Sequence, residues 1–135
     1  MSLAVGLVFY RAKGFLTGNS FLSMRNKIKA EIGFSDGEFA SYERKGDELT
    51  VLVDAWNGTR LALVFSQFEG ALDLGLGDVS DFVEETEPDG FFDQVISRIY
   101  TEPPEKHPYH YYQFLDLDDQ PVLVIVASDV RIVSA

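Results

Sequence analysis

The chain has 135 residues, of which 46% are hydrophobic, so it is long and apolar enough for a real core and unlike a disordered segment. It contains no cysteine, which excludes disulfides, thiol nucleophiles and sulfur-ligated zinc. Its net charge of −11 argues against direct nucleic-acid binding, because such proteins need cationic side chains that release counterions from phosphates.

The first part of the chain predicts a strand and a helix. Residues 3–10 form an apolar run that fits a strand and is far shorter than the ~20 residues of a membrane span. The run lacks a preceding basic residue and a cleavage site, so we expect no secretory signal and a cytoplasmic protein. In 20–33, apolar residues recur at helical spacing between Ser20, a fitting N-cap, and Gly33, a natural stop.

Residues 47–65 carry the strongest local signal. Two β-rich runs are joined by Asn57-Gly58, the preferred pair for a two-residue type I′ turn. In that register Trp56 faces Thr59 and Asp54 faces Leu61, and the large apolar side chains lie together on one side of the sheet: Leu52, Trp56, Leu61, Leu63 and Phe65. We expect a helix to cover the other side, and we expect Trp56→Ala to destabilise the protein by roughly 3–5 kcal/mol.

The remaining elements alternate strands with one more helix. Residues 88–100 predict this helix, with Asp89 as its N-cap. Strands are expected at 38–49, in short pieces within 68–85, and at 109–117, 121–128 and 130–135. The fold class is therefore α+β, a strongly bent antiparallel sheet of about five to seven strands with two packed helices. We expect one domain over 1–135, with 1–20 as a peripheral extension and Met24 as a rival start.

Acidic side chains are concentrated in the second half of the chain. Residues 61–135 carry three basic and fifteen acidic side chains, and no basic residue lies between Glu69 and Asp93. Runs of like charge are most often solvated faces, but a complementary potential also speeds and selects docking of a basic protein. The candidate interface consists of Glu69, Asp73, Asp78, Asp81, Glu84, Glu85 and Glu87.

The segment KHPYHYYQFLDLDDQPVLVIV, residues 106–126, holds both histidines beside three tyrosines and a group of aspartates. His107 and His110 stand three apart across a proline, unlike a helical pair of ligands, so we expect no metal site. The stretch GLGDVS lacks the third glycine of a dinucleotide fingerprint, and DLDDQP lacks the glycine of a calcium loop, so we expect no cofactor. A second, polar candidate site consists of Asp54, His107, His110 and Tyr111.

Two stretches, YERKGDELTVLVDAWNGTRLALVF (42–65) and HPYHYYQFLDLDDQPVLVIVA (107–127), resemble a family of small bacterial proteins of uncharacterised function. This resemblance implies no activity and no site residues. In size, charge and architecture the chain is also similar to the acidic immunity proteins of bacterial toxin systems.

The leading hypothesis is therefore a non-enzymatic protein-binding role, in which an acidic surface engages a basic partner. An immunity or antitoxin-like role would be one instance. A carboxylate-based hydrolase and a small-ligand-binding protein with a pocket in the curved sheet stay open as alternatives. The oligomeric state, a dimer included, is left open as well.

Overall fold

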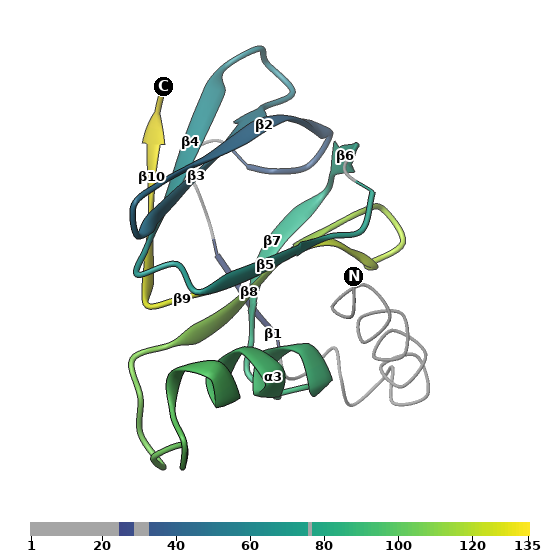
Figure 1. The fold of residues 1–135 in the computed structure, drawn as a ribbon. Helices are drawn as coiled ribbons and strands as arrows, with labels where there is room; N and C mark the ends of the chain where they lie inside the picture. Colours follow the sequence, from purple (N-terminus) through teal and green to yellow (C-terminus); the bar gives the residue numbers. More distant parts are fainter. Residues whose placement is uncertain (1–24, 29–32, 76) are drawn as a thin grey trace.

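A computed structural model describes residues 25–28, 33–75 and 77–135 (Figure 1). The described residues form ten strands and one helix. In chain order these are β1 (Arg25–Lys27), β2 (Gly37–Lys45), β3 (Glu48–Asp54), β4 (Arg60–Ser66), β5 (Gly70–Asp73), β6 (Asp78–Val79), β7 (Asp81–Glu85), α3 (Gly90–Ile99), β8 (His110–Leu115), β9 (Pro121–Ala127) and β10 (Asp129–Ser134). The strand expected at 3–10 and the peripheral extension 1–20 lie outside the described residues.

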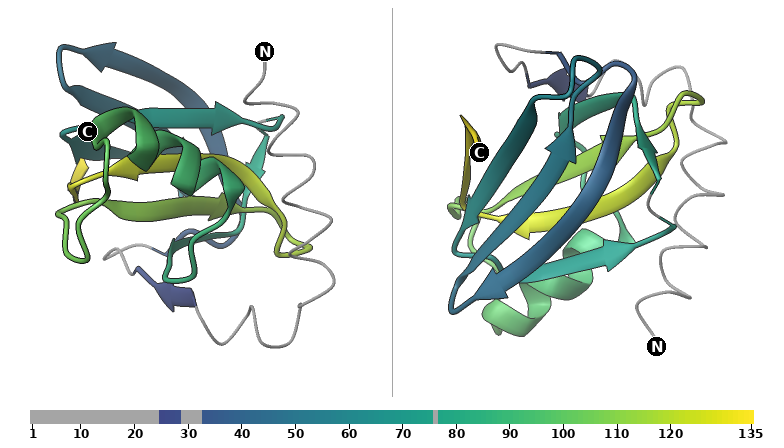
Figure 2. Two further views of the ribbon diagram at one scale, coloured as in Figure 1. Left: turned by 60° about the horizontal axis from the view of Figure 1, so that its bottom comes forward. Right: turned by 90° about the horizontal axis from the view of Figure 1, so that it is seen from above.

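The strands form two five-stranded antiparallel sheets (Figure 2). The first sheet has the order β1-β7-β8-β9-β5, and the second has the order β10-β4-β3-β2-β6. At two points one strand ends and the next begins a single residue later in the other sheet: β6 leads through Ser80 into β7, and β9 leads through Ser128 into β10. The expected α+β class and antiparallel pairing therefore hold, but ten described strands in two sheets replace the predicted single bent sheet of about five to seven strands.

Hydrogen bonds fix both crossings. Ser128 donates its backbone N–H and its hydroxyl to the carbonyl oxygen of Ser66, over 2.9 and 3.1 Å, which binds the β9–β10 crossing to the end of β4. The Ser80 N–H donates to the carbonyl oxygen of Leu115 over 2.8 Å. These bonds satisfy backbone groups that would otherwise be left unpaired where a strand changes sheets.

The core lies in two layers, one on each face of the first sheet. The layer between the sheets is rich in aromatic rings, with Phe82 and Phe114 centred 4.5 Å apart and Phe65 packed edge-on to both. The second layer lies between the first sheet and α3. Because both faces of the first sheet are covered, every residue of β9 is buried, as its unbroken apolar run predicts.

The helix α3 begins at its predicted cap. The Asp89 carboxylate accepts a hydrogen bond from the Phe92 N–H over 2.9 Å, which satisfies one of the free amides of the first turn. Phe91, Val95 and Ile96 form the buried stripe of the helix and pack on β5, β8 and β9 of the first sheet. The helix therefore covers the first sheet, and no helix in the described part of the chain covers the β3–β4 hairpin as expected.

The helix predicted over 20–33 is wrong where the structure describes it. Arg25–Lys27, in the middle of that range, is strand β1 and pairs with β7 through Arg25↔Glu85 and Lys27↔Val83. The described residues thus contain one packed helix where two were predicted. No helix in residues 25–28, 33–75 and 77–135 is long and apolar enough to cross a membrane.

The β3–β4 hairpin has a register one residue away from the predicted one. Val53 pairs with Leu61, and the loop is closed by an Ala55 N–H bond to the Thr59 carbonyl oxygen and by a Gly58 N–H bond to the Ala55 carbonyl oxygen, over 2.8 and 2.9 Å. Gly58 has a φ of 84°, so the connection is a type I turn followed by a left-handed residue, the common three-residue loop.

A register shift of one residue moves every side chain of a strand to the opposite face. Leu49, Val51 and Val53 therefore face the core, whereas the predicted core residue Trp56 is 68% exposed at the end of the hairpin. Leu52, also predicted to lie with Trp56 in the core, faces the outer side opposite Ala62.

The exposure of Trp56 reverses the expected effect of its removal. We predict that Trp56→Ala changes the free energy of unfolding by no more than about 0.5 kcal/mol, because it removes few buried contacts. The matched core substitution Phe114→Ala should cost about 3–5 kcal/mol, since its ring is fully buried against the rings of Phe65 and Phe82. Urea unfolding followed by far-UV circular dichroism measures both. If Trp56→Ala lowered the free energy of unfolding by several kcal/mol, the result would contradict the exposed position of Trp56 and support the register predicted from the sequence.

Candidate functional site

A pocket of about 280 Å³ opens where the end of β7, the start of α3 and the start of β8 meet. We call it the aromatic–acidic pocket. Its lining residues include carboxylates and aromatic rings but no lysine or arginine: Glu84, Glu85, Thr86, Pro88, Phe92, His107, Tyr109, His110 and Tyr111. It therefore joins part of the candidate interface to three of the four residues of the polar candidate site.

Pairing of β7 with β8 brings these residues together from positions about 25 apart in the chain. Glu84 pairs with Tyr112 and Glu85 pairs with Tyr111. Side chains alternate along a strand, so His110 lies on the same face as Glu84, while Glu85 and Tyr111 face α3. The pocket thus lies at the end of the sheet, with one carboxylate from each face.

Aromatic rings form one wall of the pocket. The ring of His107 is centred 5.9 Å from Phe92 and 6.0 Å from Tyr109, and Phe92 in turn lies 5.4 Å from the buried Tyr111. The Tyr109 N–H donates to Nδ1 of His107 over 3.2 Å, which holds the imidazole at the end of the proline-containing loop. These contacts pre-form the wall.

The Glu84 carboxylate lies at the rim. Its Oε2 atom is 2.9 Å from Nδ1 of His110, and its side chain is 30% exposed. The described part of the chain supplies no hydrogen bond to the other oxygen, Oε1. Burial and, after it, the negative charge of Glu69 raise the pKa of Tyr109, so Glu69, which directly precedes β5, adds to the negative potential of the rim.

Glu85 lies deeper, and its side chain is fully buried. The Arg25 guanidinium approaches it at 3.4 Å from β1, and the Glu87 N–H donates to its Oε2 atom over 3.4 Å. Burial raises the pKa of Glu85 from 4.5 to about 7, although the Glu87 amide and the Arg25 charge act in the opposite direction. The buried carboxyl therefore holds a proton over much of the range below neutral pH.

The other candidate interface residues are spread over the two sheets. Asp81 forms an ion pair with Lys27 over 3.1 Å, and Asp73 accepts a hydrogen bond from Tyr42 at the far edge of the first sheet. Asp78 lies in β6, in the second sheet. The structure therefore brings Glu84, Glu85 and the adjacent Glu87 together at the pocket, with Glu69 near its rim, and places these three aspartates elsewhere.

Asp54 does not belong to this pocket. It sits at the exposed end of β3, where Nε and Nη2 of Arg60 donate to its two oxygens over 2.7 and 3.0 Å. Those hydrogen bonds lower the pKa of the Asp54 carboxyl. The pairing Asp54↔Arg60 replaces the expected pairing with Leu61, so the same register shift that exposes Trp56 removes Asp54 from the apolar face.

Phe92 is a functional candidate that the sequence did not single out. Phe92 belongs to the helix predicted over 88–100, yet it lies beside the buried residues of that helix and faces His107. Within the described ranges, no group of three or more histidine, cysteine, aspartate or glutamate side chains is placed to hold a metal ion.

Comparisons with protein-family models, with curated proteins and with solved structures found no match to this chain. The resemblance to small bacterial proteins and to immunity proteins accordingly stays a prediction.

The buried Glu85 generates a pH prediction. Its proton is lost near pH 4.5 in the unfolded chain but only near pH 7 in the folded protein. The folded state therefore binds more protons between these values, so this stabilising contribution is complete below pH 4.5 and is lost as the pH rises through 7. We expect the loss to be about 3 kcal/mol, because each unit of pKa difference corresponds to roughly 1.4 kcal/mol.

Glu85→Gln keeps the shape of the side chain and cannot titrate. Wild type should therefore lose stability relative to Glu85→Gln as the pH rises across this window. Urea unfolding at steps of half a pH unit measures the difference in unfolding free energy. A difference that is constant from pH 4.5 to 7.5 would contradict the raised pKa.

Proposed function

We propose that the chain is a non-enzymatic binding protein whose aromatic–acidic pocket accepts a lysine or arginine side chain of a basic protein partner. One observation carries the proposal: the pocket combines carboxylates with several aromatic rings, and none of its lining residues is cationic. The proposal joins the acidic interface expected from the sequence to a specific cavity.

The chemistry of the lining suits a cation. A Lys or Arg side chain has an apolar stem and a charged end, so it gains from both apolar walls and a carboxylate rim. The faces of aromatic rings attract cations by about 0.5–2 kcal/mol, more where water is excluded. Phe92 and Tyr109 offer such rings, and Glu84 supplies the opposite charge.

The charge of the whole chain supports the same class of partner. A net charge of −11 attracts a basic protein over a distance and raises the rate of encounter, and the effect weakens with salt. Neutralising a basic toxin is one instance of such a role. Glu87 is exposed next to the pocket and would contribute to the same potential.

Glu84 offers the sharpest test, because it is at the rim and not part of the buried core. We predict that Glu84→Gln weakens binding of an eight-residue peptide of alternating Lys and Ser by about fivefold, which corresponds to roughly 1 kcal/mol. Asp118→Asn is the matched control: it removes the same charge from an exposed site in the β8–β9 turn, at the other end of β8. It should change the affinity less than twofold.

The affinities are measured by NMR titration at low ionic strength. Equal effects of the two substitutions would show that the peptide responds only to net charge, and would contradict a specific pocket. Reversing the charge of Glu85 is not a clean test, because a buried cation beside Arg25 would unfold the protein.

The Glu84–His110 hydrogen bond favours a second candidate, the carboxylate-based hydrolase. A histidine oriented by a carboxylate in a concave site is the arrangement of a general base. Against it, Glu85 projects from the opposite face of the sheet, so the two carboxylates do not both flank His110. Turnover of chromogenic esters or glycosides that is lost in His110→Ala and kept in Asp54→Asn would favour the hydrolase over the binding protein.

A further inference from the structure

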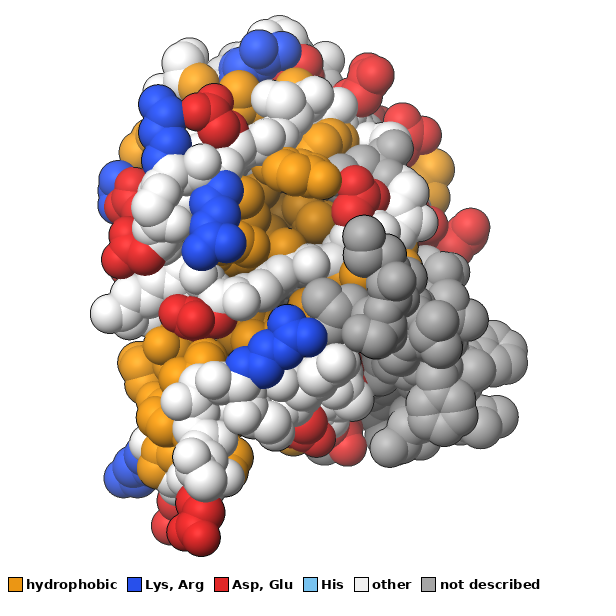
Figure 3. Space-filling view, viewed as in Figure 1, with side chains coloured by type: hydrophobic (Ala, Val, Ile, Leu, Met, Phe, Trp, Pro, Cys, Tyr) orange, Lys and Arg blue, Asp and Glu red, His pale blue; other side chains and the backbone are white. Residues whose placement is uncertain are grey.

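A second hollow lies between the two sheets, away from the aromatic–acidic pocket. Figure 3 shows hydrophobic side chains gathered in it on one face of the molecule. Its volume is about 510 Å³, within the ~300–1,000 Å³ range of small-molecule sites. Its lining comes from β2, β3, β5, β9 and the β4–β5 connection. It shares no residue with the other pocket: Tyr42, Glu43, Arg44, Leu49, Phe68, Ala71, Asp73 and Leu123.

Backbone hydrogen bonds close this hollow at both ends. At one end the Phe68 N–H donates to the Asp47 carbonyl oxygen over 2.7 Å, and at the other the Phe39 N–H donates to the Gly77 carbonyl oxygen over 2.9 Å. Between these bonds the edge of β2 and the edge of β5 face each other unpaired within the described chain. We call the opening between them the window. A volume of about 510 Å³ between these bonds suits a compact molecule.

The interior of the window is apolar. Leu49 and Leu123 are almost fully buried side chains of the two sheets, and they form its floor together with the short side chain of Ala71. Burying hydrocarbon against such a surface is favourable by roughly 25 cal/mol for each Å² removed from water. The occupant therefore needs an apolar body.

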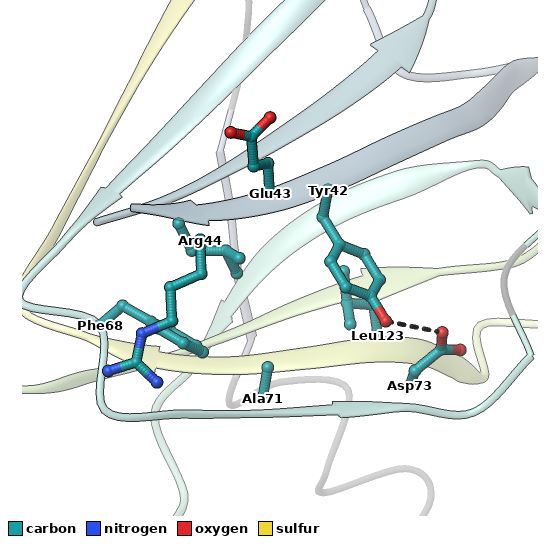
Figure 4. A pocket seen from close by; sticks show the side chains of 8 residues that line it. Tyr42, Glu43, Arg44, Phe68, Ala71, Asp73 and Leu123 are labelled. Atoms are coloured by element: carbon teal, nitrogen blue, oxygen red, sulfur yellow. Dashed lines mark hydrogen bonds between the residues drawn. The ribbon is translucent and has the colours of Figure 1, made fainter. Parts of the chain in front are cut away.

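The two ends of the window differ in charge, as Figure 4 shows. At one end the Arg44 guanidinium lies 5.2 Å from the ring centre of Phe68, and its Nε donates to the Gly46 carbonyl oxygen over 3.0 Å. At the other end the Tyr42 hydroxyl donates to Asp73 over 3.5 Å. An anion is therefore favoured at the first end and disfavoured at the second.

Arg44 is held in a receptive position. The ring of Phe68 and the Gly46 carbonyl oxygen fix the guanidinium, and no residue in the described part of the chain forms an ion pair with it. Its terminal nitrogens remain available for the fork-shaped pair of hydrogen bonds that a carboxylate accepts.

We propose that the window binds a small apolar carboxylate. The carboxylate accepts hydrogen bonds from Arg44, and the hydrocarbon body lies over Ala71 and Leu123 and points toward Tyr42. This site is independent of the basic-partner pocket, so either can fail without the other.

Octanoate tests the proposal, with 1-octanol as a probe that has the same chain length without the charge. Binding is measured by isothermal titration and by amide chemical shifts. Arg44→Gln should weaken octanoate at least tenfold and leave 1-octanol within twofold, because it removes only the carboxylate partner. Arg131→Gln, an exposed arginine on β10, is the matched control and should leave both probes within twofold.

Ala71→Phe fills the window and should weaken both probes at least tenfold, while circular dichroism checks that the variant folds. If Ala71→Phe does not fold, shifts confined to β2 and β5 in the wild type report the same location. Absence of octanoate binding, octanoate binding unaffected by Arg44→Gln, or shifts confined to other strands would overturn the proposal.

Discussion

The two crossings at Ser80 and Ser128 are the constraint on which the fold depends. Because the chain passes from one sheet to the other at both points, the inner faces of the sheets are held together by covalent chain as well as by packing. The Ser66–Ser128 hydrogen bonds tie the last strand to β4 at one corner. On the remaining side the chain changes sheets only through the β4–β5 and β5–β6 connections, and no described strand pairs with the facing edges of β2 and β5 between them. The same strand topology therefore encloses the aromatic core and leaves the window open.

The hairpin shows why a correct local signal led to a wrong register. Asn57-Gly58 fits the two-residue turn, but Gly58 serves equally well as the left-handed residue of a three-residue loop. Both faces of β3 and β4 are apolar, so the hydrophobic pattern does not distinguish the two registers. Only the packing of Val51 and Leu63 against the first sheet decides between them. For β1 the deciding contact is still farther away, since its partner β7 lies sixty residues later.

The candidate site was predictable in part. The aromatic strand, the buried strand after it and the cap at Asp89 followed from the sequence, because each depends on neighbouring residues. Tyr111 lies in the core, while Tyr109 and His110 lie at the rim, a distinction that alternation alone left open. The meeting of Glu84 with His110 was not predictable, because a helix and a proline-rich loop separate them in the chain and only strand pairing brings them together.

The exposed end of the β3–β4 hairpin has a spectroscopic consequence. Trp56 is the sole tryptophan of the chain, and it is already in water in the native state. Its emission should shift little when the core is lost, so an intensity trace that looks flat in denaturant would not mean that the fold has survived. The near-ultraviolet dichroism of the buried Tyr111 and Tyr112 reports the packing that tryptophan emission does not follow.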